Sequence, residues 1–290
     1  MQEKQKHLIN LSGTVAVVTG ASRGVGRGIA LALAEEGATV YVTGRTVQKG
    51  SNRLPGTIGD TAAEATRRGG KGIAVAVDHG DDAQVAALFE QIRAEEGRLD
   101  ILVNNAIYVP DDMNEPGGFW QKPLSHWRMI DIGLRSYFVA AWHAARMMVS
   151  QRSGLIVGIS AHVGVTYAMS VVFGTCKSGV DRMARDMAIE LKPHDVASIS
   201  LWQGFAYTEG NELRLKQYPS LAEFAANCAG SSVEFPGRVI AALARDPKRM
   251  ARSGGTYIAA ELAREYGVTD GDRIPRYARD QYGSPIWSPV

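Results

Sequence analysis

Short apolar runs rich in valine and isoleucine alternate along the chain with longer segments whose apolar residues recur at helical spacing. This alternation is typical of βαβ units, in which a parallel sheet lies buried between helices. The predicted strands are Thr14–Val18, Thr39–Thr43, Gly72–Val77, Ile101–Val103, Leu155–Ile159, Val196–Leu201 and Thr256–Ala259. The predicted helices are Arg27–Glu36, Asp81–Glu96, Ser125–Val149, Gly174–Leu191 and Val233–Ala244. We therefore expect an α/β fold, with residues 1–290 forming one doubly wound domain around a seven-stranded parallel sheet.

The composition is that of a globular protein, since 45% of the 290 residues are hydrophobic and 21% are charged. Lysine and arginine (32) nearly balance aspartate and glutamate (30), so we expect neither a nucleic-acid partner nor a polybasic membrane anchor. Two cysteines, Cys176 and Cys228, are too few for a disulfide framework or a four-cysteine metal site. They predict a reducing, cytoplasmic location and no metal centre, and no apolar run is long enough to span a membrane.

Two long segments interrupt the alternation of predicted strands and helices. Thr46–Asp60 follows the second strand, and Phe205–Ser232 follows the sixth. Both can be variable surface insertions, but the second leaves the carboxyl end of a strand, where open sheets bind ligands. We therefore interpret residues from about 205 to 232 as a substrate lid. The C-terminal tail, about 268–290, is rich in arginine, tyrosine and proline and is predicted to be irregular.

The first predicted strand runs directly into the glycine-rich turn Thr19–Gly26 and then into a helix. In such a turn Gly20 lets the chain reverse, Gly24 lets the backbone approach a pyrophosphate, and Gly26 lets the helix pack close to the sheet. Backbone N–H groups and the helix dipole then face the phosphates. A glycine cluster alone is weak evidence, but its place between a strand and a helix predicts a dinucleotide site.

The residues after the second strand predict which dinucleotide is bound. A site for NAD places an acid at this strand end, where it bonds the ribose hydroxyls. Here the stretch Val42–Arg45 contains no acid, and Arg45 offers a guanidinium to a 2′-phosphate, with Arg23 as a second cation. We therefore expect NADP(H) rather than NAD, the alternative being that both arginines are merely solvated.

Polar residues also follow the third and fourth predicted strands. Asp78 and His79 are placed to contact the adenine, and Asn104, Asn105 and Ala106 close the fourth strand. The asparagine pair can bond the backbone of the turn as well as line the cofactor groove, and the two roles are compatible.

The TGASRGVG turn, the NNA after the fourth strand and Lys177 near the start of a helix give the chain a resemblance to the classical short-chain dehydrogenase/reductase family, from about Leu11 to Tyr266. The segments Asp131–Arg135, Ser200–Gly204 and Leu262–Gly267 are similar to the branch around dehydrogenase/reductase family member 1. The resemblance implies a single Rossmann-like domain, assembled as a homodimer or homotetramer, that moves hydride between NAD(P) and an alcohol or carbonyl. Such motifs are far less specific for the substrate.

The family's chemistry implies a tyrosine that exchanges a proton with the substrate, a lysine four residues later, a serine that bonds the carbonyl and a supporting asparagine. Lys177 is in place, but Phe173 stands at the tyrosine position. Gly133 stands at the asparagine position, which can be a property of this branch rather than a loss. Alignment on the fifth strand puts Ala161 at the serine position, whereas counting back thirteen residues from Phe173 gives Ser160.

General acid–base catalysis contributes about 10²–10⁴-fold, so loss of the tyrosine costs that much unless another group substitutes. Candidate donors are His162, Tyr167 and Tyr108. His162 follows the fifth strand, at the edge where the nicotinamide is expected, and histidine titrates near neutral pH. A loop histidine is more often only hydrogen-bonded, and the two tyrosines can simply shape the pocket. The predicted catalytic residues are Lys177, Ser160 and His162.

The segment Gln203–Thr208 resembles the family's Pro-Gly-x-x-x-Thr loop, in which Gly204 and Thr208 match and Gln203 replaces the proline. The residues expected to bind the cofactor are Gly20, Ser22, Arg23, Gly24, Val25, Gly26, Arg45, Asp78, His79, Asn105, Ala106, Lys177, Gly204 and Thr208. An apolar pocket for a small hydrophobic substrate forms if the following aromatic residues converge, and otherwise they pack in the core: Phe119, Trp120, Trp127, Trp202 and Phe205.

These patterns favour an NADP(H)-dependent oxidoreductase that acts on a hydrophobic alcohol or carbonyl with an altered catalytic constellation. Two alternatives use the same scaffold. One is a non-redox enzyme such as a lyase, isomerase or cyclase, and the other is a catalytically silent NADP-binding protein.

Overall fold

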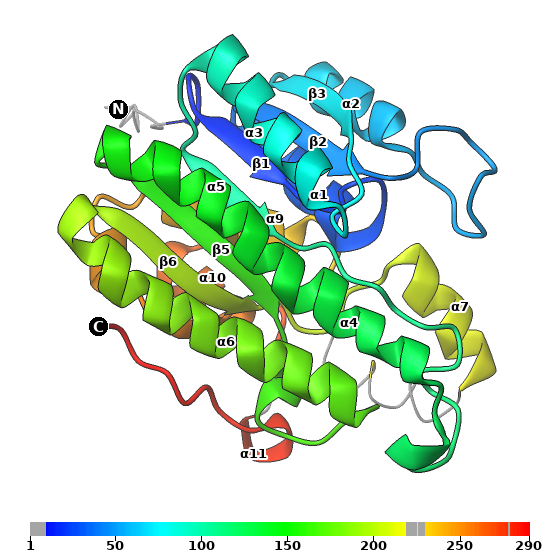
Figure 1. Ribbon diagram of the computed structural model, residues 1–290. Helices are drawn as coiled ribbons and strands as arrows, with labels where there is room; N and C mark the ends of the chain where they lie inside the picture. The colour runs from blue at the N-terminus through cyan, green and yellow to red at the C-terminus, as the bar shows by residue number, and fades with distance from the viewer. Residues whose placement is uncertain (1–9, 219–224, 226–229, 278) are drawn as a thin grey trace.

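The computed structural model describes residues 10–218, 225, 230–277 and 279–290. In these ranges seven parallel strands form one sheet (Figure 1). The strands are β1 (Val15–Val18), β2 (Thr39–Gly44), β3 (Lys71–Ala76), β4 (Ile101–Asn104), β5 (Gly154–Ser160), β6 (Val196–Trp202) and β7 (Thr256–Ile258). The predicted α/β fold class and every predicted strand are confirmed, with each strand end shifted by no more than one residue.

The strand order is β3-β2-β1-β4-β5-β6-β7, so the winding of the chain reverses between β1 and β4. Every residue of β1, β4, β5 and β6 is buried, which is why these strands read as continuous apolar runs rather than alternating ones. The carboxyl ends of β1 and β4 diverge at the reversal, and open α/β sheets bind their ligands in such a crevice.

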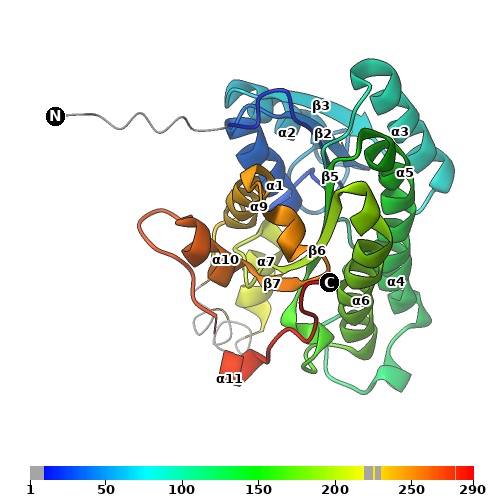
Figure 2. The ribbon, with the colours of Figure 1, turned by 90° about the vertical axis from the view of Figure 1, so that its left-hand side faces the viewer.

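Helices cover both faces of the sheet, as the side view shows (Figure 2). One layer contains α1 (Gly24–Glu35), α2 (Ile58–Arg67), α9 (Phe235–Arg245) and α10 (Ala259–Tyr266). The other contains α3 (Asp82–Glu96), α5 (Ser136–Gln151) and α6 (Val171–Leu191). Successive side chains of β1 serve two separate cores: Ala16 and Val18 pack with the first layer, and Val15 and Val17 with the second. No helix in the described part of the chain is both long and apolar enough to cross a membrane.

Outside the lid and the tail, three helical regions differ from the prediction. One is α10, which begins at Ala259, predicted as strand, and continues where no helix was predicted. No helix was predicted at α2, because most residues on its buried face are small. Residues Ile58–Asp60, predicted as loop, form the first turn of this helix. Thr57 caps the turn, since its Oγ1 accepts the Asp60 N–H (2.9 Å). The predicted helix Ser125–Val149 is divided, because α4 (Arg128–Ile130) and a π-helical turn at Asp131–Arg135 precede α5.

The predicted lid contains the helix α7 (Glu209–Gln217), and its residues 219–224 and 226–229 lie outside the described residues. The start of α7 adjoins the loop that follows β2, since a Cβ on Gly210 would lie 3.4 Å from Leu54 Cδ1. The C-terminal tail, predicted to be irregular, contains one helical turn, α11 (Arg279–Tyr282). Beyond it, the Trp287 carbonyl oxygen accepts the N–H of Thr256 in β7 (3.0 Å).

Gly28 allows α1 to lie directly against the backbone that leads into α9. A Cβ at this position would lie 2.0 Å from the Val233 carbonyl oxygen. We expect Gly28→Ala to lower the free energy of unfolding by about 1–3 kcal/mol, because one backbone must move away from the other. Urea unfolding followed by circular dichroism measures the change.

Gly59→Ala is the matched control. Gly59 is exposed on α2, and a Cβ there would meet only Thr57 Oγ1, at 3.8 Å. Alanine is more favourable than glycine in a helix by up to about 1 kcal/mol, so this variant should be at least as stable as the wild type. Equal unfolding free energies for the two variants would contradict the tight α1–α9 contact.

Candidate active site

The glycine-rich turn between β1 and α1 is packed against the residues that follow β4. Gly20 and Gly24 have φ angles of 66° and 54°, which residues with a side chain rarely adopt. A Cβ on Gly26 would lie 2.4 Å from both the Gly20 carbonyl oxygen and Asn105 Nδ2. Asn105 Nδ2 in turn donates to the carbonyl oxygens of Thr19 (2.9 Å) and Gly20 (3.2 Å). The turn therefore has the conformation and the close contacts that a phosphate-binding turn requires.

Asn105 and Ala106 tie the end of β4 to this turn. The backbone N–H groups of both residues donate to Thr19 Oγ1, at 2.9 Å each. A Cβ on Gly20 would lie 2.8 Å from the Ala106 Cα, so no larger residue fits there. Asn104, buried in β4, donates to the Tyr137 carbonyl oxygen (3.1 Å). Both asparagine side chains therefore donate hydrogen bonds to backbone carbonyl oxygens, which is one of the two roles predicted for the pair.

The first turn of α1 receives its anionic partner from the predicted lid. Arg23 at the N-cap makes no side-chain bond to the helix, and the first turn contains no acid. The Gly24 N–H instead donates to the carboxylate of Glu209 at the start of α7 (Oε2, 3.0 Å). Ser22 and Val25 are buried beside it. Sequence reasoning missed Glu209, and its only signal was an acid directly after Thr208.

The two predicted arginines differ in what they contact. The Arg23 guanidinium donates to the carbonyl oxygens of Pro55 (2.8 Å) and Gly56 (3.0 Å), so it braces the loop between β2 and α2. Burial lowers the pKa of Arg23, and the charge of Arg45 lowers it further. Arg45 is exposed at the end of β2, with Asp78 Oδ2 at 3.8 Å from its guanidinium. Arg45 is therefore the cation with room to receive a ligand.

His79, predicted to contact the adenine, lies buried beneath the ends of β2 and β3. Its Nε2 is 2.8 Å from Thr43 Oγ1, and its Nδ1 has no hydrogen-bond partner within the described ranges. Burial lowers its pKa to about 4. Asp78 is half-buried beside it and accepts the Gly80 N–H (2.9 Å). Of this pair, Asp78 is the one accessible from solvent, and the adenine contact stays a prediction.

Lys177 is buried on α6, at the carboxyl end of β5. Its ammonium donates to the Ile159 carbonyl oxygen (2.8 Å) and lies 5.8 Å and 5.9 Å from the ring centres of Tyr137 and Phe173. Burial lowers the pKa of this lysine. Phe173 stands at the position where the family resemblance implies a tyrosine. Its ring has no hydroxyl proton to exchange with a substrate.

Ser160 faces away from this groove. Its hydroxyl donates to the Lys177 carbonyl oxygen (3.2 Å) and is almost inaccessible to solvent. Ala161 continues the extended backbone, so its side chain lies on the opposite face. The predicted carbonyl-binding role of Ser160 would require this buried side chain to turn over, and Ala161 occupies the position that faces the groove.

Gly133 lies buried in the π-helical turn before α5. A Cβ at this position would be 2.8 Å from Cys176 Sγ and 3.1 Å from Ile107 Cγ1. A side chain here, such as the asparagine that the family resemblance implies, would require the buried Cys176 and its neighbour Ile107 to move. The packing at this turn therefore favours glycine.

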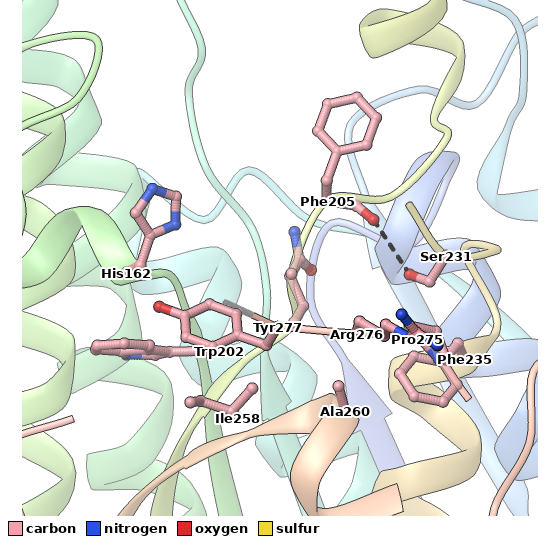
Figure 3. Close-up of a pocket in the computed structure, with 12 residues that line it drawn as sticks. His162, Trp202, Phe205, Ser231, Phe235, Ile258, Ala260, Pro275, Arg276 and Tyr277 are labelled. Atoms are coloured by element: carbon pink, nitrogen blue, oxygen red, sulfur yellow. Dashed lines mark hydrogen bonds between the residues drawn. The ribbon is translucent and has the colours of Figure 1, made fainter. Parts of the chain in front are cut away.

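A pocket lies between the loop after β6, α10 and the C-terminal tail (Figure 3). Its cavity volume is about 20 Å³, little more than a water molecule needs, so a substrate would require the lining side chains to move. Among its lining residues are His162, Trp202, Gln203, Phe205, Phe235 and Tyr277. Trp202 and Phe205 from the predicted aromatic set converge here, whereas the following three are exposed elsewhere: Phe119, Trp120 and Trp127.

Of the three predicted proton donors, His162 is the one that lines this pocket. Its ring centre is 5.3 Å from that of Tyr282 in the tail, and burial lowers its pKa. Tyr167 is 77% exposed, and the Tyr108 ring lies under the Arg128 guanidinium (4.7 Å). Tyr277 and Tyr282, which sequence reasoning left in an irregular tail, are the aromatic residues that join His162 here.

Of the predicted loop residues, Gly204 lines the pocket and Thr208 lies against Gly24 of the turn. Gly204 has a φ of 79°, and Thr208 caps α7 by accepting the Asn211 N–H (3.1 Å). Gln203 Oε1 is buried without a hydrogen-bond partner in the described part of the chain. No group of three or more His, Cys, Asp or Glu side chains in the same ranges is arranged to hold a metal ion.

Stability should depend on pH through His79. The pKa of His79 is near 4 in the folded chain and about 6.5 in the unfolded chain. Between these two pH values the unfolded chain binds a proton that the folded chain does not bind. The free energy of unfolding should therefore fall by about 3 kcal/mol more in the wild type than in His79→Gln between pH 7 and pH 4. Urea unfolding across this range measures the difference. His194→Gln, in the turn after α6, serves as control, and identical profiles for wild type and His79→Gln would refute a neutral buried imidazole.

Comparisons with known proteins agree with this geometry. Residues 14–218 match the family model described as short chain dehydrogenase. The human protein "Dehydrogenase/reductase SDR family member 1" is 40% identical over 275 residues, covering 91% of this chain and 85% of the relative. The Aquifex aeolicus 3-oxoacyl-[acyl-carrier-protein] reductase FabG is 32% identical, covering 69% of this chain and 77% of the relative.

A solved short-chain type dehydrogenase/reductase from Mycobacterium marinum superposes with a TM-score of 0.73 at 29% identity, covering 86% of this chain and 94% of that one. The extent of the family match and the identity to the human relative together assign the chain. It belongs to the short-chain dehydrogenase/reductase family of oxidoreductases, as a relative of the family member 1 branch.

Proposed function

We propose that this protein is an NADP(H)-dependent oxidoreductase that acts on a small hydrophobic alcohol or carbonyl. The observation that carries the proposal is the exposed guanidinium of Arg45 at the end of β2, whose one ion-pair partner among the described residues is Asp78, at 3.8 Å. A phosphate on the 2′ position of the ribose is the group that such a cation would bind.

The residues present fit a dinucleotide. Gly20 and Gly24 leave backbone space and N–H donors at the start of α1, next to the reversal in strand order. Thr208 approaches the same turn from the lid, since its Cγ2 would lie 3.3 Å from a Cβ on Gly24. When bound, NADP(H) supplies or accepts the hydride.

Lys177 would bind the nicotinamide ribose by exchanging its bond to the Ile159 carbonyl oxygen for one to a ribose hydroxyl. His162 is our candidate for proton transfer at the substrate. Because burial lowers its pKa, its imidazole is neutral at neutral pH and suited to take a proton from an alcohol. Delivering a proton to a carbonyl requires prior protonation, so the reductive direction should be favoured by lower pH.

One observation favours a second candidate function, an NADP-binding protein without redox activity. Phe173 has no exchangeable proton, and the Ser160 hydroxyl is bonded inside the core. In that case the pocket would bind a ligand without converting it. The two candidates differ in whether any turnover is measured with the wild-type protein.

Arg45→Gln tests the cofactor. We expect the dissociation constant for NADPH to rise about 10- to 100-fold, the range of a lost charge-assisted bond, while that for NADH changes little. Titration of nicotinamide fluorescence measures both. Arg93→Gln, an exposed change of the same kind on α3, should alter neither value. An equal loss of affinity for NADPH and NADH would show that Arg45 does not bind the 2′-phosphate.

Phe173→Tyr tests the altered catalytic site. A phenol at this position would stand beside Lys177, so we expect kcat for NADPH-dependent reduction of hydrophobic ketones to rise at least 10²-fold. Phe138→Tyr, on the exposed face of α5, is the matched control and should leave kcat unchanged. His162→Gln should lower the residual wild-type rate and shift its pH profile. A Phe173→Tyr variant no faster than wild type, with His162→Gln also unaffected, would exclude the redox proposal.

A further inference from the structure

The Glu209 carboxylate accepts a hydrogen bond from a backbone N–H group that a bound phosphate would also use. Its Oε2 accepts the Gly24 N–H at 3.0 Å, at the first residue of α1. The N–H groups at the start of a helix have no partner within the helix, and an anion is favoured there. α1 provides no acid of its own in this turn, so the anion comes from a residue 185 positions away.

The start of the lid holds Glu209 in place over the turn. Thr208 accepts the Asn211 N–H (3.1 Å), and Asn211 Nδ2 donates to the Ala206 carbonyl oxygen (2.9 Å). The Thr208 methyl group lies against Gly24, as the short distance to a Cβ there shows (3.3 Å). Because these contacts are intramolecular, the carboxylate is present at the donor at a high effective concentration.

A carboxylate and a diphosphate cannot share this site favourably. Both are anions, and the Arg23 guanidinium, which interacts electrostatically with Glu209, is bonded to the Pro55 and Gly56 carbonyl oxygens. A dinucleotide that places its phosphates on the turn must therefore displace Glu209, and with it the first residue of α7.

We propose that Glu209 sets the affinity for the dinucleotide by acting as an internal competitor for its phosphates, so that cofactor binding releases the start of the lid. The inference rests on the proposed dinucleotide site. It does not depend on the choice between NADP and NAD, because both contain the same pyrophosphate. A protein whose competent state is populated a fraction f of the time binds with an apparent dissociation constant raised by 1/f.

Glu209→Gln is the decisive variant, since it removes the charge and keeps the size. We expect its dissociation constants for NADPH and NADH to fall by the same factor, about 5- to 10-fold, as measured by fluorescence titration. Glu212→Gln is the matched control, because Glu212 is exposed in the same first turn of α7 and changes the net charge equally. Its affinities should stay within about twofold of wild type.

Two further measurements separate this inference from the proposed function. Inorganic pyrophosphate, which contains no nicotinamide, should also bind Glu209→Gln more tightly than wild type. Amide hydrogen exchange in α7 should be faster in Glu209→Gln than in Glu212→Gln without cofactor, because the contact with Gly24 is weakened.

Unchanged or weaker dinucleotide binding by Glu209→Gln would overturn the inference. Weaker binding would show that Glu209 stabilises the bound cofactor instead of competing with it. If neither NADPH nor NADH binds any variant, the proposed function fails. The pyrophosphate titration then decides the competition by itself: tighter binding to Glu209→Gln supports it, and equal binding refutes it.

Discussion

The close approach of α1, β1 and β4 at the reversal in strand order governs the geometry of the whole site. Gly20 and Gly26 leave no space for a Cβ against Ala106 and Asn105, and Asn105 bonds the carbonyl oxygens of the turn. Any side chain added there would push the helix from the sheet or open the crevice. The positions of the phosphate donors, the lid contact and the groove toward β5 all follow from this one packing.

Behind Lys177, a buried polar cluster connects the groove to the pocket. Asp181, one turn further along α6, accepts bonds from Ser200 Oγ (2.5 Å) and Trp202 Nε1 (3.0 Å). Burial raises the pKa of Asp181, while these donors and the charge of Lys177 oppose the rise. On the same helix, the Lys177 carbonyl oxygen accepts the Ser160 hydroxyl and holds it in the core. Asp181 also fixes the Trp202 ring that lines the pocket, so the lysine and the pocket wall are positioned by one helix.

The features that could be predicted are those with a local physical cause. Buried parallel strands must be continuously apolar, so their ends were found within one residue. The turn at Gly20 and Gly24 could be predicted because positive φ angles select glycine. The absence of a hydroxyl proton on the Phe173 ring likewise follows from the identity of that one residue. None of these required knowledge of distant contacts.

What could not be predicted depends on contacts between distant segments. Glu209 meets Gly24 across 185 residues, and Tyr277 reaches the pocket from a tail with no periodic pattern. The inward direction of Ser160 depends on the Lys177 carbonyl oxygen, on another element. α2 was not predicted for a different reason, because the residues on its buried face are mostly small: Thr61, Ala62 and Ala65 lie there beside Ile58.

The course of the C-terminal tail bears on how copies of this chain can associate. β7 is an edge strand, and an edge with free N–H and C=O groups can pair with a strand of another chain. Here the Trp287 carbonyl oxygen already bonds the Thr256 N–H, and the Trp287 ring lies beneath the guanidinium groups of Arg182 and Arg185. A second copy could not extend the sheet through Thr256 without first lifting this segment. Pairing at the β7 edge therefore competes with the tail, whereas the opposite edge of the sheet is formed by β3.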